Sequence, residues 1–305
     1  METISYPSNN GVSTISAKLY IPVQRDIIAV LQISHGMCEH IERYKDFAQY
    51  LCSKGFVVCG NDHLGHKNSV TSDEQLGFFA ENDGHNHLVN DIHKLTVLVK
   101  SQYPGTPYFL LGHSMGSFVA RCCLASFGGE YDGAILSGTG GKNPLAPAGK
   151  KLAELLCKTQ GAKKRSKLLD TLVFGSYNSR FKSRTGKEWL TRNTAVVDAY
   201  LADKNCMFLF TNSAMKDSIM LTMLANTPEY AQKLPRNLPI YLFSGTDDPV
   251  GDYGKGVQDV YDMIKKAGVF DVTLKLYKGG RHEMLNETNS AEVYDDIYEW
   301  IKRKT

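Results

Sequence analysis

The segment GHSMG, from Gly112 to Gly116, is the feature that most restricts how this chain can fold. An apolar run, YFLLG, leads into it, and a helical pattern, SFVARCCLASFG, follows it. A serine between two glycines at such a junction is typical of a strained strand-to-helix turn, where larger neighbours would clash. Glycine and serine are also common in ordinary turns, so the five residues alone are a weak signal. The strand before them and the helix after them favour a turn that exposes the hydroxyl of Ser114.

Strands and helices are expected to alternate on both sides of this turn. Apolar strands without polar alternation, separated by helices, indicate a mostly parallel sheet covered on both faces, so the predicted fold class is α/β. The two N-terminal strands, 14–22 and 26–36, are expected to form an antiparallel pair at the sheet edge. The other predicted strands are 56–62, 108–112, 133–138, 240–245 and 271–277, and the predicted helices are 43–55, 88–104, 117–128, 254–268 and 290–304.

The alternation stops between about residues 142 and 236, where amphipathic helical segments such as KLAELLCKTQ appear. Nearly a hundred residues without a sheet strand are too many for a loop. We therefore expect residues 142–236 to form an inserted helical cap, or lid. Residues 1–141 and 237–305 would together form the α/β core.

A serine hydroxyl is a weak nucleophile near neutral pH, so it needs a base, and the base needs a group that orients it. Asp247 and Asp248 follow one predicted strand, and His282 follows the last one. In a parallel sheet these loops all emerge at the carboxyl ends of the strands, where such sheets place their sites. Ser114, one of the two aspartates and His282 can therefore converge, in the chain order Ser, Asp, His.

Such a site also needs donors for the negative charge that develops on a carbonyl oxygen, and these are usually two backbone N–H groups. The residue after the serine, Met115, is the first candidate. The second is expected in SHGMCEH, after strand 26–36, where Gly36 allows a close approach of the backbone and Met37 supplies the N–H.

Composition excludes several other classes of protein. The chain has 305 residues, of which 42% are hydrophobic and 22% charged, with a net charge of +3, so nothing points to a nucleic-acid partner. The N-terminus lacks a signal-peptide pattern, and no apolar run approaches the ~18 residues that a membrane span needs. The seven cysteines lack metal spacing, which favours reduced thiols and a cytoplasmic location. His85 and His87 lack partners at metal-binding spacing, so no metal is expected.

Five motifs together resemble the α/β-hydrolase superfamily and, within it, the monoacylglycerol lipase and lysophospholipase-like serine hydrolases. They are HGMCEHIERY, NDHLGHKNS, GHSMGS, GTDDPV and HEMLNE, and the cap segment GKEWLTRNTAVVDAYLADKNC is also similar to the family pattern. The resemblance implies an α/β-hydrolase fold with Ser114 as nucleophile, Asp248 rather than Asp247 as acid, and His282 as base. It also implies Met37 and Met115 at the oxyanion hole.

The same resemblance suggests residues that bind substrate. In monoacylglycerol lipases the E-H-x-x-R-Y segment helps hold the polar end of the substrate, which points to Glu39 and Arg43 here. The alternative is that these two side chains pair with each other and shape the loop. Gly36 and His113 are also placed at the substrate, although His113 is expected to brace a loop rather than react.

Departures from the family pattern concern the entrance of the pocket. Lys67 stands where the family has a second glycine, and Met37 and Cys38 replace smaller residues. These changes favour medium acyl chains over long ones. Phe78 and Phe79 would line an acyl tunnel or pack in the core.

The predicted function is hydrolysis of carboxylic esters through an acyl-enzyme, without a cofactor, acting on monoacylglycerols or similar small lipid esters. An aminopeptidase of the same fold is the alternative, since Glu39 could grip a free amine. A lysophospholipase and a non-catalytic ligand receptor are weaker alternatives, and a complete triad argues against the receptor. The basic run GAKKRSK in the cap would permit transient contact with a membrane surface, or would simply be a solvated face.

Overall fold

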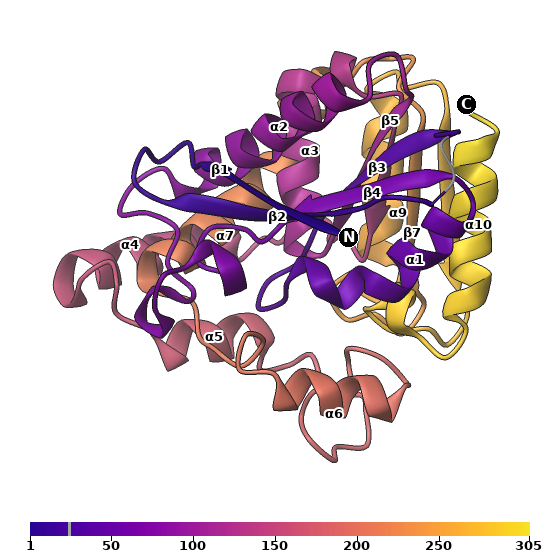
Figure 1. The fold of residues 1–305 in the computed structure, drawn as a ribbon. Helices are drawn as coiled ribbons and strands as arrows, with labels where there is room; N and C mark the ends of the chain where they lie inside the picture. The colour runs from indigo at the N-terminus through magenta and orange to yellow at the C-terminus, as the bar shows by residue number, and fades with distance from the viewer. Residues whose placement is uncertain (24–25) are drawn as a thin grey trace.

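A computed structural model describes residues 1–23 and 26–305 of the chain. Within these residues, eight strands form one sheet in the order β1-β2-β4-β3-β5-β6-β7-β8 (Figure 1). From β4 to β8 every neighbouring pair is parallel. The predicted α/β class is therefore confirmed. The strands are β1 Glu2–Pro7, β2 Thr14–Tyr20, β3 Ala29–Ser34, β4 Phe56–Asn61, β5 Tyr108–His113, β6 Gly133–Ser137, β7 Ile240–Gly245 and β8 Val272–Tyr277.

The predicted antiparallel pairing of 14–22 with 26–36 is wrong. Strand β2 pairs antiparallel with β1 on one side and with β4 on the other, whereas β3 lies between β4 and β5. All six residues of β3 are buried, and a strand buried on both faces belongs in the middle of a sheet. Strand β1 is largely exposed, as suits an edge strand, and its short polar pattern was missed.

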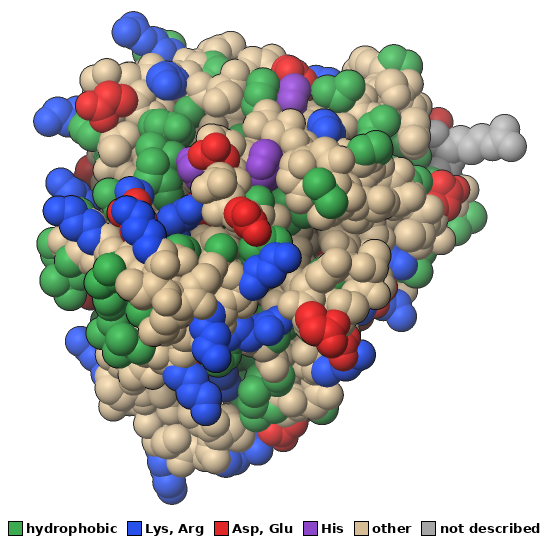
Figure 2. Space-filling model, turned by 90° about the vertical axis from the view of Figure 1, so that its left-hand side faces the viewer, with side chains coloured by type: hydrophobic (Ala, Val, Ile, Leu, Met, Phe, Trp, Pro, Cys, Tyr) green, Lys and Arg blue, Asp and Glu red, His purple; other side chains and the backbone are tan. Residues whose placement is uncertain are grey.

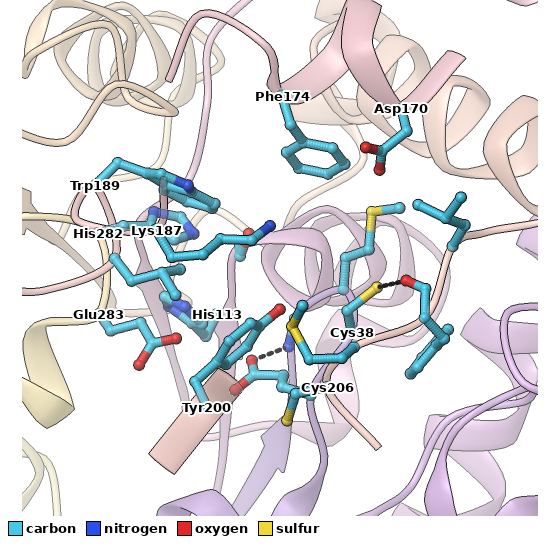
Figure 3. A pocket seen from close by; sticks show the side chains of 18 residues that line it. Cys38, His113, Asp170, Phe174, Lys187, Trp189, Tyr200, Cys206, His282 and Glu283 are labelled. Carbon is cyan, nitrogen blue, oxygen red and sulfur yellow. Dashed lines mark hydrogen bonds between the residues drawn. The ribbon is translucent and has the colours of Figure 1, made fainter. Parts of the chain in front are cut away.

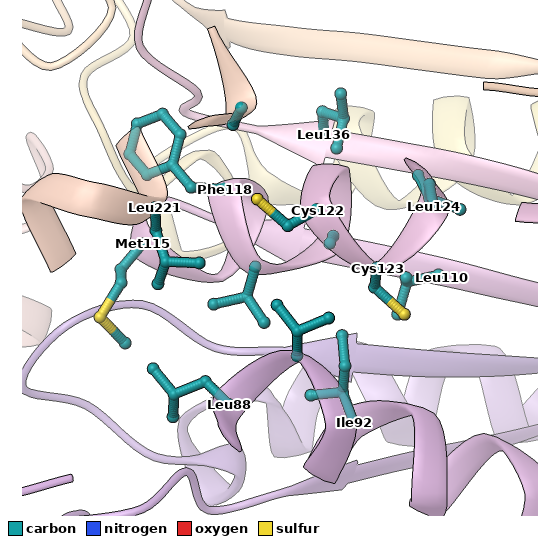
Figure 4. Close-up of a cluster of buried hydrophobic side chains, with 14 of the residues drawn as sticks. Leu88, Ile92, Leu110, Met115, Phe118, Cys122, Cys123, Leu124, Leu136 and Leu221 are labelled. Carbon is teal, nitrogen blue, oxygen red and sulfur yellow. The ribbon is translucent and has the colours of Figure 1, made fainter. Parts of the chain in front are cut away.

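Helices cover both faces of the sheet. One face carries α2 (Gly84–Gln102), α3 (Met115–Phe127) and α9 (Lys255–Lys266), and the other carries α1 (Lys45–Ser53) and α10 (Ser290–Lys302). Figure 4 shows Leu88 and Ile92 from α2 on one side of α3, with Leu136 of β6 on the other side, and all of these residues belong to one buried hydrophobic cluster. This packing on both faces of the sheet fixes the positions of the carboxyl ends of the parallel strands.

The segment between β6 and β7 contains five helices of the described chain: α4 (Ala146–Gln160), α5 (Lys167–Phe174), α6 (Thr194–Ala202), α7 (Asn212–Ala225) and α8 (Pro228–Gln232). Helix α7 packs against α2, α3 and α4, so part of this segment shares the main hydrophobic cluster. Helices α5 and α6 extend away from the sheet in Figure 1. A separate, small cluster in the same segment consists of Trp189, Leu190, Tyr200 and Cys206.

Candidate active site

Ser114 occupies the junction between β5 and α3 with φ of 52° and ψ of −122°, a conformation that is costly for a residue with a side chain. Its N–H donates to the Ser137 carbonyl at 2.9 Å. The flanking glycines have a steric reason. A Cβ on Gly116 would overlap the carbonyl oxygen of Ser34, and one on Gly112 would overlap the backbone of Gly116. The packed backbone therefore holds the strained turn in place.

Asp248 and His282 form a hydrogen-bonded pair at the ends of β7 and β8. The Nδ1 atom of His282 lies 3.0 and 3.1 Å from the two carboxylate oxygens of Asp248. Asp248 also accepts hydrogen bonds from the Ser244 hydroxyl at 2.7 Å and from the Val250 N–H at 2.9 Å. Its neighbour Asp247 is exposed. The structure therefore distinguishes the two adjacent aspartates: Asp248 is buried and bonded to His282, whereas Asp247 is exposed.

Burial alone would lower the pKa of His282, but the Asp248 carboxylate outweighs it and raises the pKa above 6.5. Asp248 shows the reverse balance, since burial would raise its pKa and the His282 charge and hydrogen bond lower it. The pair is therefore arranged to stabilise a proton on the imidazole while the aspartate stays ionised.

His113, the residue before Ser114, lies beside this pair. Its ring centre is 4.7 Å from that of His282, and its Nδ1 is 3.1 Å from the Ser137 hydroxyl. Burial and the neighbouring His282 lower its pKa to about 4, so it is neutral near pH 7. His113 lines the cavity described below, although the bond to Ser137 gives it a bracing role as well.

The loop after β3 places Gly36 and Met37 next to Ser114. A Cβ on Gly36 would lie 3.0 Å from the Ser114 Cβ, so the glycine permits this approach. Among the described residues, neither the Met37 N–H nor the Met115 N–H has a hydrogen-bond acceptor. For Met115 this follows from its place as the first residue of α3, where N–H groups lack partners within the helix.

Three buried histidines, His35, His63 and His66, lie next to this loop and are bonded to it or to one another. His66 Nε2 accepts a hydrogen bond from the Cys38 N–H at 3.3 Å, and His35 Nδ1 donates to the Gly36 carbonyl at 2.8 Å. Burial lowers the pKa of His66 to about 4 and that of His63 to about 3. A neutral imidazole has one nitrogen that donates a hydrogen bond and one that accepts, so these rings can bond to both the N–H and the carbonyl groups of the loop and hold it in place.

Glu39 and Arg43 form part of a buried ion network. Arg43 donates to Glu39 at 2.9 Å and, through two nitrogens, to Glu283 at 2.8 and 2.6 Å. Glu39 also accepts hydrogen bonds from the Gly36 N–H and the Tyr44 hydroxyl. The structure thus contains the Glu39–Arg43 pairing that was the alternative to substrate contact. Glu283 was missed, although its position next to His282 was a usable signal.

A cavity of about 260 Å³ opens onto these groups (Figure 3). Ser114 and His282 line it, as do Gly36, Met37, Glu39 and His113, whereas Arg43 lies outside the lining. The remaining walls include the charged side chains of Asp170, Lys187 and Glu283 and the large, mostly apolar side chains of Phe174, Trp189, Leu190, Tyr200, Met207 and Phe208. Phe78 and Phe79 are not among the lining residues. Phe79 packs against Phe210 and His66 instead, so its core role is the one observed.

One set of metal-ligating atoms lies close together in the described part of the chain: those of His40, Asp203 and Cys206, all within 4.8 Å of one another. His40 Nε2 is bonded to Asp203 at 2.8 Å, and the Lys67 ammonium lies 3.4 Å from His40 Nδ1. The lysine already supplies a positive charge at this position. We therefore interpret the bonded side chains of His40 and Asp203 as a link between the loop after β3 and the segment after α6.

The fold and the site together define a class. A serine on a strained turn, a histidine–aspartate pair and a mostly parallel sheet make this chain an α/β-hydrolase. The family model described as serine aminopeptidase, S33, matches residues 25–289, and the chain belongs to that family. In the described residues no helix is long and apolar enough to cross a membrane.

Relatives narrow the chemistry. The chain is 29% identical to the monoglyceride lipase of Homo sapiens over 289 residues, covering 91% of this chain and 83% of the relative. It is 27% identical to the monoacylglycerol lipase of Mycolicibacterium smegmatis over 278 residues, covering 89% and 87%. A carboxyl esterase from Bacillus coagulans, solved in complex with glycerol, superposes with a TM-score of 0.93 at 30% identity over 98% of this chain and 97% of that one. The chain is a carboxylic ester hydrolase, and its resemblance to monoacylglycerol lipases is confirmed.

Proposed function

We propose that the protein hydrolyses monoacylglycerols and similar small lipid esters through Ser114, His282 and Asp248. The observation that carries the proposal is the opening of Ser114 and the Asp248-bound His282 into one cavity whose walls include several large apolar side chains. The names of the relatives, monoglyceride lipase and carboxyl esterase, agree with this substrate class.

In the proposed reaction His282 accepts the proton of Ser114 as the serine oxygen attacks the ester carbonyl. Asp248 holds the imidazole orientation and stabilises the imidazolium. The N–H groups of Met37 and Met115 bind the developing oxyanion. His282 then gives the proton to the departing alcohol, and a water molecule repeats the sequence on the acyl-enzyme, releasing the fatty acid and the free serine.

The alternative of an aminopeptidase is less well supported. A free amine needs an uncompensated carboxylate beside the reacting groups, and the two next to His282, Glu39 and Glu283, are both bonded to Arg43. The third acidic residue of the lining, Asp170, already has the positive charge of Lys187 acting on it. An ester substrate needs no such group. The apolar walls instead favour an acyl chain, because each buried CH₂ contributes about 0.8 kcal/mol.

A substrate panel tests the proposal. We expect faster hydrolysis of 1-octanoylglycerol than of trioctanoylglycerol, whose three chains the cavity cannot admit, and faster hydrolysis of both than of aminoacyl p-nitroanilides. The measurement is kcat/KM for each compound, together with labelling by a fluorophosphonate probe. A preference for the aminoacyl amides over every ester would overturn the assignment.

Arg43→Met should reduce hydrolysis of 1-octanoylglycerol and of p-nitrophenyl octanoate to the same extent. The change leaves Glu39 and Glu283 buried without a cation, which typically costs about 3–5 kcal/mol of stability. Urea unfolding and kcat/KM on both esters measure the two effects.

The matched control is Arg184→Met, which breaks an exposed pair with Asp198 and should leave the free energy of unfolding nearly unchanged. A loss confined to the glycerol ester, with stability unchanged, would instead place Arg43 in direct contact with the substrate.

A further inference from the structure

Lys187 is the one lysine or arginine among the described residues that line the cavity. Figure 3 shows its amino group reaching into the cavity between the Trp189 and Tyr200 walls. The Trp189 ring, two residues further along the chain, lies 5.2 Å from the His282 ring, and both Trp189 and Lys187 line the cavity onto which Ser114 and His282 open. Among the described residues it forms no ion pair. This cation is therefore available to a ligand.

Three acidic side chains line the cavity with Lys187: Glu39, Glu283 and Asp170. Glu39 and Glu283 are compensated by Arg43. Asp170 stands beside Phe174 in Figure 3, apart from the lysine amino group. Burial raises the pKa of Asp170, and Lys187 partly opposes that rise. The cavity thus combines two carboxylates that are paired with Arg43, an Asp170 carboxylate and a Lys187 ammonium that each lack an ion-pair partner among the described residues, and Asp170 is the negative charge that an anionic ligand must outcompete.

The segment that contains Lys187 is also rich in positive charge. Residues 142–191 contain 12 Lys and Arg against three Asp and Glu, whereas the rest of the chain contains 23 against 29. Figure 2 shows many Lys and Arg side chains on the face that lies on the left in Figure 1, where α4 and α5 are found. Such a field raises the local concentration of anions and speeds their association.

From these observations we infer that the protein also hydrolyses esters that carry an anionic group, and that Lys187 is the residue that selects it. The group is a phosphate or a carboxylate, and the lysine ammonium binds it by charge-assisted hydrogen bonds. The inference rests on the proposed function of Ser114, because the anionic ester is cleaved by the same serine.

The test compares an anionic ester with its neutral counterpart, each below its micelle concentration. One pair is 1-octanoylglycerol 3-phosphate and 1-octanoylglycerol, which places the charge on the alcohol. The other is monomethyl octanedioate and methyl octanoate, which places it on the acyl chain. The quantity measured is the ratio of kcat/KM, anionic over neutral, within each pair.

Lys187→Met should lower this ratio about tenfold or more in at least one pair, and the affected pair identifies the side of the ester that carries the charge. Asp170→Asn should raise the same ratio, because it removes a negative charge from the cavity. Lys182→Met, an exposed lysine of the same segment, is the matched control and should leave the ratio unchanged.

An unchanged ratio in both pairs for Lys187→Met would overturn the inference, as would an equal fall for Lys182→Met, which would indicate attraction by the surface alone. A fall of the ratio in Asp170→Asn would also contradict it. None of these outcomes affects the role of Ser114, which the absolute rate on the neutral esters tests separately.

Discussion

Ser114→Ala should lower kcat for ester hydrolysis by about 10⁴-fold or more while the fold stays intact. The hydroxyl is the proposed nucleophile, and no other hydroxyl or thiol can replace it at this turn without moving the backbone. Alanine keeps the Cβ of serine, so it brings no new clash at a φ of 52°. His282→Ala should give a loss of the same order, because nucleophile and base act as one unit.

The measurement is steady-state kcat with 1-octanoylglycerol, accompanied by fluorophosphonate labelling and a thermal unfolding curve. Ser179→Ala changes an exposed serine in the segment between β6 and β7 and should keep full activity. If folded Ser114→Ala retained a tenth of the wild-type turnover, the proposed role of this serine would be wrong.

Asp248→Asn should cost about 10⁴-fold in kcat, whereas Asp247→Asn should cost little. The amide cannot accept the His282 Nδ1–H through its nitrogen, and it carries no charge to stabilise the imidazolium. Asp248 is fully buried and bonded to His282, while Asp247 is exposed and accepts a hydrogen bond from the Thr246 hydroxyl at 3.3 Å. The adjacent position makes Asp247→Asn a matched control.

Rates of both variants over pH 6 to 9 would also distinguish a chemical from a structural defect. Equal losses in the two variants would point to a general disturbance of the loop after β7, and a larger loss in Asp247→Asn would reverse the assignment.

The parts of the fold that sequence predicts well are those with a local physical cause. The buried strands β3 to β7 show as mainly apolar runs, and Gly112 and Gly116 mark a turn that only small residues permit. The loops of parallel strands meet at one edge, so the relative positions of Ser114, Asp248 and His282 followed from their places after strands.

The parts that sequence did not predict depend on partners distant along the chain. From the sequence, Arg43 is equally consistent with a ligand for glycerol and with an ion-pair partner, and its pairing with Glu283, 240 residues away, is visible only in the structure. Strand β1 gains its place from pairing with β2, since its own pattern is weak. The position of Lys187 in the cavity depends on how the segment before α6 folds back over the β3 loop, which no local pattern encodes.

The division of the β6–β7 segment between two hydrophobic clusters has a consequence for how the molecule fluctuates. Leu156 of α4 and Leu221 of α7 share the cluster that covers the sheet, so their amide protection should be lost only in the global unfolding step. Trp189 and Tyr200 belong to the small cluster, which buries far less surface, so their surroundings should exchange through local openings of lower free energy. The least protected stretch of the segment is then the wall of the cavity itself, and substrate can enter while α4 and α7 keep their native hydrogen bonds.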